Sequence, residues 1–327
     1  MIKNGKLISL LGLIIVVVLW GVAPIAGKYL FDHDYVTPAL LVAIRGLLSL
    51  VAMLIIILFT KGFKDVTKAY LICIPAGLFL GCAYLFQFIG LESTTPAKNT
   101  FLESLSCIAV PICMFIFSRE KPTISEIFAA LFCLLGAFVL CGKGFDFSAM
   151  FNEPTLGDIL SAIGGIFFGI DIAFTKVFAK NKNPLVYVFF QLVILTIMSF
   201  IYAIPFEKNI HFTFQIYPIL VAIFLGVICT AVCWVLRTKC IERVSAVTCA
   251  VLMPMSAVVA TFTSIILRME EFSWNVVVGG LIITSAIVIS GIFDAKMKQK
   301  HKMQELEMNK IKENEGENID EQNPCDE

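Results

Sequence analysis

The chain has 327 residues, of which 58% are hydrophobic and 15% are charged, and its formal net charge is zero. A soluble globular domain carries about 25% charged residues, so this composition excludes an ordinary soluble protein. The eleven cysteines show no metal-ligand spacing, and they give no indication of a metal site or of a disulfide framework.

Ten apolar stretches of helical length follow one another along the chain. A bilayer core about 30 Å thick is crossed by roughly 20 apolar residues in a helix. The connections between the stretches are short, so they leave no room for a soluble domain before residue 294. The predicted membrane spans cover residues 8–30, 36–60, 69–91, 96–118, 124–142, 157–180, 184–204, 216–236, 245–267 and 274–293.

The distribution of Lys and Arg predicts that both termini lie in the cytoplasm. With the N-terminus inside, the inner loops carry twelve basic side chains and the outer loops carry four. Cytoplasmic loops of membrane proteins are enriched in Lys and Arg, which favours this orientation. Residues 294–327 begin basic and turn acidic after Glu305, a composition typical of a disordered tail on the cytoplasmic side.

The second five spans repeat the first five. The same pairs recur at the same spacing: a glycine lies seven residues before a lysine, and a proline lies seven residues before a polar side chain. The pairs are Gly21 and Lys28 with Gly169 and Lys176, and Pro38 and Arg45 with Pro184 and Gln191. A unit of five helices is odd, so the second copy must cross the membrane in the opposite sense. The sequence thus predicts an all-α integral membrane protein of two inverted repeats, residues 1–148 and 149–293.

Small residues and prolines inside the spans indicate close packing and hinges. Gly77 and Gly81 in the third span, like Gly165 and Gly169 in the sixth, have the four-residue spacing that lets helix backbones approach. These faces serve either plain packing or sliding between conformations.

Two prolines lie in corresponding spans of the two halves. Pro111 in the fourth span and Pro254 in the ninth each remove a helix hydrogen bond and free a carbonyl group. We expect hinges at both, although a proline kink that neighbouring helices tolerate is the alternative.

One junction carries a resemblance to a known family. Residues 85–102 read LFQFIGLESTTPAKNTFL, and Pro111 follows. This stretch resembles the junction of the third and fourth helices in the EamA-like branch of the drug/metabolite transporter superfamily, and Trp20 and Arg45 stand at similar places. The resemblance covers residues 8–293 and implies ten helices around a central cavity. Cys107, where a proline is usual, and Gln191, where an arginine is usual, depart from the family pattern.

Three ionisable side chains lie deep inside predicted spans, where charge is costly and indicates function. At 1.5 Å per residue, Arg45 lies about 14 Å and Glu103 about 10 Å below the outer ends of their spans, and Asp171 about 21 Å below its own. Arg45 and Glu103 either pair with each other, or Glu103 binds a solute amine or a proton while Arg45 controls its charge. Asp171 is either a satisfied structural group near Lys176 or a proton or cation site.

Other polar side chains in the spans are expected to complete a pocket. Aromatic rings with a few placed polar groups are typical of a small-molecule site. Lys28 and Lys176 lie near opposite membrane faces, where they are expected to extend to the lipid headgroups. The uncharged candidates for the cavity wall are Tyr84, Gln87, Asn99, Gln191 and Trp234.

These features predict a secondary transporter in the plasma membrane of a bacterium, exporting a small polar or amphipathic metabolite such as an amino acid. The resemblance implies alternating access around the central cavity. The sequence has no phosphate-binding loop, so coupling is expected from protons or another solute. The alternative is a non-transporting sensor or scaffold that acts through the charged tail.

An enzyme is not expected, because the three histidines are scattered outside the spans. The expected partners are a small solute, the lipid bilayer and, in a homodimer, a second copy of the chain. No cofactor, metal or nucleic acid is expected.

Overall fold

The computed structural model describes residues 2–60, 62–119, 121–141, 155–269, 271–286 and 288–289. The predicted tail at residues 294–327 and the predicted boundary between repeats at residues 148 and 149 lie outside the described residues.

Helices form nearly all of the described chain, and its β-structure is one bridge between Val36 and Phe212. Short 3₁₀ segments at Gly62–Asp65 and Lys68–Ile72 lead into the third span. In chain order the helices are α1 (Ile2–Asp32), α2 (Pro38–Thr60), α3 (Cys73–Glu92), α4 (Pro96–Glu103), α5 (Ser106–Ser118), α6 (Ile124–Cys141), α8 (Leu156–Phe178), α9 (Pro184–Phe206), α10 (Ile216–Ile223), the π-helix η3 (Phe224–Val232), α11 (Cys233–Ile241), α12 (Ala246–Leu252) and α13 (Met255–Ile266).

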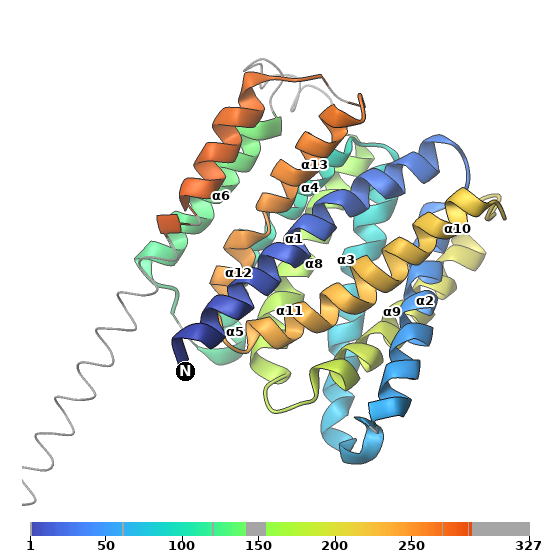
Figure 1. Ribbon diagram of the computed structural model, residues 1–327, viewed down its shortest axis with the longest axis horizontal. Helices are drawn as coiled ribbons and strands as arrows, with labels where there is room; N and C mark the ends of the chain where they lie inside the picture. The colour runs from blue at the N-terminus through green and yellow to red at the C-terminus, as the bar shows by residue number, and fades with distance from the viewer. Residues whose placement is uncertain are drawn as a thin grey trace, which may run out of the picture.

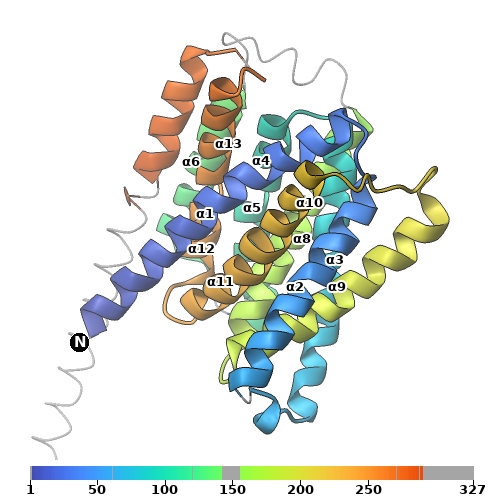
Figure 2. The same ribbon diagram turned by 45° about the vertical axis from the view of Figure 1, so that its right-hand side comes forward.

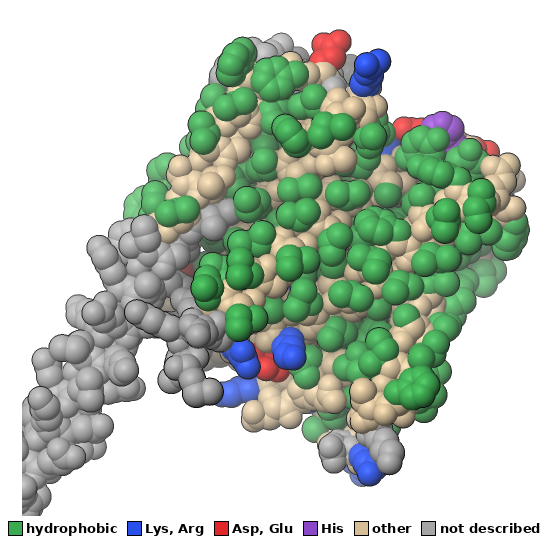
Figure 3. Space-filling view, viewed as in Figure 1, with side chains coloured by type: hydrophobic (Ala, Val, Ile, Leu, Met, Phe, Trp, Pro, Cys, Tyr) green, Lys and Arg blue, Asp and Glu red, His purple; other side chains and the backbone are tan. Residues whose placement is uncertain are grey.

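The helices form one bundle that fits a membrane. Among the described residues, eight segments have the length and hydropathy to cross it, and two shorter apolar helices, Glu126–Leu140 and Trp274–Ala286, complete the predicted ten. The two shorter helices lie together at one edge, α2 and α9 lie at the other, and α1, α3, α8 and α11 lie between them (Figures 1 and 2). Hydrophobic side chains cover the middle of the visible face, and charged side chains gather at its two ends (Figure 3).

The second half of the bundle is inverted relative to the first. Lys28 near the end of α1 donates through Nζ to the carbonyl oxygen of Glu92 at the end of α3 (2.8 Å). At that same end, Asp158 in the first turn of α8 accepts hydrogen bonds from Lys98 Nζ (2.6 Å) and Thr94 Oγ1 (2.7 Å). Since α1 finishes where α8 begins, the two helices that open the repeats run in opposite senses.

The two repeat lysines, Lys28 and Lys176, cap helix ends. Lys176 near the end of α8 donates through Nζ to the carbonyl oxygens of Ile241 and Val244, both at 2.7 Å, just as Lys28 donates to the end of α3. A cation is favourable beside the unsatisfied carbonyl groups of a helix C-terminus. The extension of these side chains to the lipid headgroups stays a prediction.

Spans four and nine are each broken near the middle. The break between α4 and α5 lies at residues 104–105, where Leu105 N donates to Leu102 O (3.1 Å) in a tight turn. The break between α12 and α13 includes Pro254, where a hinge stays a prediction. Pro111 lies inside α5, so the interruption in the fourth span occurs at a place that has no proline.

Glycines bring α8 against the broken fourth span. A Cβ atom at Gly165 would lie 2.5 Å from the carbonyl oxygen of Leu102 and 2.8 Å from Cα of Glu103. Both of these are backbone atoms, which cannot move without shifting the helix. Gly165 therefore fixes how closely α8 approaches the end of α4.

We expect Gly165→Ala to destabilise the protein by about 1–3 kcal/mol, because the added methyl group overlaps backbone atoms. Thermal unfolding in detergent measures the effect. Gly280→Ala is the matched control, since its nearest neighbour would be Val258 Cγ1 at an ordinary 3.5 Å. Equal melting temperatures for the two variants would contradict the packing described.

Candidate functional site

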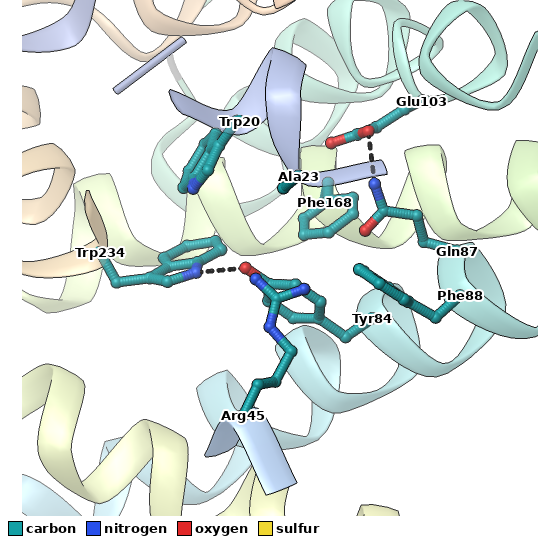
Figure 4. A pocket seen from close by; sticks show the side chains of 9 residues that line it. All are labelled: Trp20, Ala23, Arg45, Tyr84, Gln87, Phe88, Glu103, Phe168 and Trp234. Atoms are coloured by element: carbon teal, nitrogen blue, oxygen red, sulfur yellow. Dashed lines mark hydrogen bonds between the residues drawn. The ribbon is translucent and has the colours of Figure 1, made fainter. Parts of the chain in front are cut away.

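A small cavity lies in the middle of the bundle, where α1, α2, α3, α4, α8 and α11 meet (Figure 4). Its volume is about 20 Å³, which is room for about one water-sized group. A metabolite therefore enters only if the surrounding helices move apart. The cavity is lined by Trp20, Ala23, Arg45, Tyr84, Gln87, Phe88, Glu103, Phe168 and Trp234.

Glu103 supplies the acid of the cavity. It is the last residue of α4, immediately before the break in the fourth span. Gln87 on α3 donates a hydrogen bond through Nε2 to Glu103 Oε2 (2.7 Å) (Figure 4). The carboxylate keeps its second oxygen for another partner, so the position suits a group that accepts a cation or a proton.

Arg45 supplies the positive charge, and it is only 1% exposed. Its guanidinium carbon lies 4.6 Å from the ring centroid of Tyr84 and 4.8 Å from that of Phe88, within the range of cation–π attraction. Nε donates to Thr230 Oγ1 (3.0 Å), whereas Nη1 has no hydrogen-bond partner among the described residues. Arg45 and Glu103 form no ion pair in the described chain, and the interpretation that they lock two helices together is wrong.

The π-helix η3 shapes the wall next to Arg45. Thr230, the acceptor for Arg45, donates through its own hydroxyl to Leu225 O (2.7 Å). Trp20 Nε1 donates to Cys229 O (2.8 Å), which joins α1 to the same segment. π-Helical turns are rare and are frequent at functional sites. The apolar sequence of η3 gave no signal for this conformation.

Aromatic rings close the cavity. Trp234 Nε1 donates to Tyr84 OH (2.6 Å), and the Trp20 and Trp234 rings lie 5.0 Å apart. The rings of Phe168 and Tyr84 lie 5.4 Å apart. These rings give the cavity apolar walls around its two charged groups.

A second buried cluster lies in the second repeat. Asp171 on α8 and Arg237 on α11 are both fully buried, and Arg237 Nη1 lies 3.0 Å from Asp171 Oδ2. Gln191 on α9 donates through Nε2 to the other oxygen of Asp171. Asp171 therefore pairs with Arg237, and Lys176 caps a helix end elsewhere.

Arg237 was missed because the predicted eighth span ended at residue 236 and the arginine was assigned to the inner loop. Helix α11 continues to Ile241, and the guanidinium of Arg237 lies 4.6 Å from the ring of Trp234. Trp234 thus separates this cluster from the cavity, which it also lines.

The sequence candidates divide between the cavity and its supports. Arg45, Tyr84, Gln87, Glu103 and Trp234 line the cavity. The other candidates, Asn99, Asp171 and Gln191, bind neighbouring helices.

Asn99 is an example of a support. Its Nδ2 donates to Gln87 O (3.0 Å) and Ser161 Oγ (2.8 Å), which holds α4 against α3 and α8. Among the lining residues missed from sequence, Trp20 and Phe168 precede the repeated glycines and could have been inferred from the repeat. Ala23 and Phe88 carried no such signal.

The fold and these buried charges define a multi-pass integral membrane protein with duplicated halves. The sequence matches the EamA-like transporter family over residues 7–142 and again over residues 155–292. The chain belongs to this family, which is a family of transporters and not of enzymes.

Three relatives are described as uncharacterized transporters. One from Archaeoglobus fulgidus is 28% identical over 211 residues, which are 62% of this chain and 62% of the relative. YyaM of Bacillus subtilis is 24% identical over 47% of this chain and 52% of its own length. YoaV of Bacillus subtilis is 22% identical over 86% of this chain and 96% of its own length. The chain thus spans less than two thirds of the first two relatives and nearly all of the third.

The fold is also found in a solved crystal structure. That structure has a TM-score of 0.69 and 17% sequence identity, and the match covers 89% of this chain and 98% of the other. At this identity the likeness concerns the fold.

We expect Asp171→Asn to destabilise the protein by about 3–5 kcal/mol, because it leaves the buried charge of Arg237 without a counterion. The double variant Asp171→Asn with Arg237→Gln should lose less than the sum of the single variants. Thermal unfolding in detergent measures all three. Asp32→Asn is the control, because its half-exposed carboxylate contacts Lys28 at the surface. Additive losses would show that the pair is not coupled.

Proposed function

We propose that the protein is a secondary transporter that exports a small polar or amphipathic metabolite, such as an amino acid, from the cell. The observation that carries this proposal is the central cavity, which holds one acid and one base that do not pair with each other. Because both repeats line it, a relative movement of the repeats changes the cavity. Membership in the EamA-like family supports the same conclusion.

The broken helices are the proposed moving parts. Glu103 lies directly before the break in the fourth span, so a change of angle between α4 and α5 moves the acid. The break that contains Pro254 lies at the corresponding place in the ninth span. Bending at these two breaks would open the cavity to one membrane face at a time, which is alternating access.

Glu103 is the proposed site of coupling to protons. Its carboxylate shares a cavity with Arg45 and accepts one hydrogen bond from Gln87. A proton and a cationic solute group would compete for the free oxygen, so binding of one favours release of the other. We place the protein in the plasma membrane with both termini in the cytoplasm.

Transport in proteoliposomes tests the proposal. We expect the wild type to exchange at least one radiolabelled amino acid or related amphipathic metabolite from a mixed panel. Glu103→Gln should lower the rate at least tenfold, because it removes the carboxylate from the cavity. Glu242→Gln, an exposed acid at the end of α11, is the control and should keep the wild-type rate. An inactive wild type, or a Glu103→Gln variant at full rate, would contradict the proposal.

A further inference from the structure

The inverted repeats can be aligned residue by residue on contacts that both halves make. In the first helix of each repeat the anchors are Lys28 and Lys176, and in the second helix they are Pro38 and Pro184. In the third helix the anchors are the carbonyl groups that the two lysines bind, Leu91 and Glu92 at the end of α3 and Ile241 and Glu242 at the end of α11. The helices that follow both begin at a hydroxyl N-cap, Thr95 and Ser245.

This alignment superposes the cavity on the buried ion pair. Two residues are equivalent when they lie the same number of residues from the same kind of anchor. The offsets are five residues before the lysine and seven after the proline. In the third helix they are four and seven residues before the first capped carbonyl, that of Leu91 or Ile241. The equivalent pairs are Ala23 with Asp171, Arg45 with Gln191, Gln87 with Arg237, and Tyr84 with Trp234. Arginine and glutamine have exchanged places between the repeats, and only the second repeat has an acid at this position of its first helix.

In the second repeat an acid lies beside the arginine and the glutamine. The carboxylate of Asp171 lies between Arg237 and Gln191 and contacts both. The charge of Arg237 is balanced by this ion pair, and its Nε, Nη1 and Nη2 make no hydrogen bond among the described residues.

In the first repeat the position that corresponds to Asp171 carries no acid, and the carboxylate in the cavity is that of Glu103 on α4, which accepts a hydrogen bond from Gln87. Ala23 lines the cavity together with Arg45 and Gln87, so the open space lies beside the position that is equivalent to Asp171. Arg45 is 1% exposed, and its Nη1 has no hydrogen-bond partner among the described residues. Glu103 lines the same cavity but forms no ion pair with Arg45 among the described residues, so the buried guanidinium has no carboxylate in direct contact. Such a buried charge is costly, and cation–π contacts with two rings offset only part of that cost.

We propose that the space beside Ala23 is a carboxylate subsite, in which the carboxylate of the solute binds Arg45 as Asp171 binds Arg237. The inference rests on the proposed function and deepens it. Glu103 lies across the same cavity from Arg45 and is placed to bind an amine, while Trp20, Phe88 and Phe168 surround an apolar side chain (Figure 4). The solute is therefore a zwitterion with an apolar side chain, bound by opposite charges at its two ends.

A mutant cycle tests the subsite without any solute. Ala23→Asp supplies from the protein the carboxylate that the solute would bring, so its melting temperature should exceed that of Ala23→Asn by at least about 3 °C. Asn has the size of Asp without the charge and is the matched control. The difference should vanish when Arg45→Gln is combined with each variant, because Arg45 is the partner. A difference that is absent, or that survives the loss of Arg45, overturns the inference.

Four probes then test the chemistry of the solute by thermal shift on the purified protein. They are L-phenylalanine, L-phenylalaninamide, 2-phenylethylamine and 3-phenylpropanoate, and the leucine series is run beside them. The amino acid and the carboxylate should stabilise the wild type, and Ala23→Asp should weaken this binding at least tenfold. Stabilisation by the amide or amine equal to that by the amino acid, or no stabilisation by either amino acid, overturns the inference.

The two proposals can fail separately. The mutant cycle needs no transport, so a positive cycle in an inactive protein would leave the subsite and remove the proposed function. Exchange of solutes that lack a carboxylate would leave the transporter and remove the subsite.

Discussion

Two arginines buried in the middle of the membrane protein need counterions, and the arrangement of the centre follows from that constraint. Arg237 finds its counterion in Asp171, and this ion pair ties α8 to α11. Arg45 rests on the rings of Tyr84 and Phe88 and has no carboxylate of the protein against it. A charged group in a bilayer is tolerated where it is paired or faces a polar cavity. The two repeats show these two solutions side by side.

The sequence predicted the spans, the repeat and five residues of the cavity wall, because each of these is visible as a pattern of residue types along the chain. An apolar run of helical length is unambiguous, and Arg45 and Glu103 stand out as charges inside such runs. Pairing could not be predicted, because it depends on how each helix is rotated about its axis. Arg237 was not predicted to be buried, because the first charge after an apolar run was taken as the end of the span. Ala23 was not predicted to line the cavity, because an alanine cannot be distinguished from other apolar residues of a span.

The ends of the helices are held more tightly than their middles. Lys28 and Lys176 cap the third helix of their own repeats, and Asp158 ties α8 to Lys98 and Thr94. The middles of spans four and nine are interrupted instead. Under the proposed function, motion at these interruptions and binding of the solute would involve the same few residues.

The π-helix in the eighth span has a consequence for how the two halves diverged. Each residue of an α-helix turns the chain by about 100°, so one inserted residue would swing every later side chain to a different face. A π-helical turn accommodates an additional residue locally. Trp234 and Arg237 follow η3 and still occupy the positions of Tyr84 and Gln87. The second repeat thus has a π-helical segment where the first repeat has the continuous helix α3, and the internal symmetry of the centre is kept beyond it.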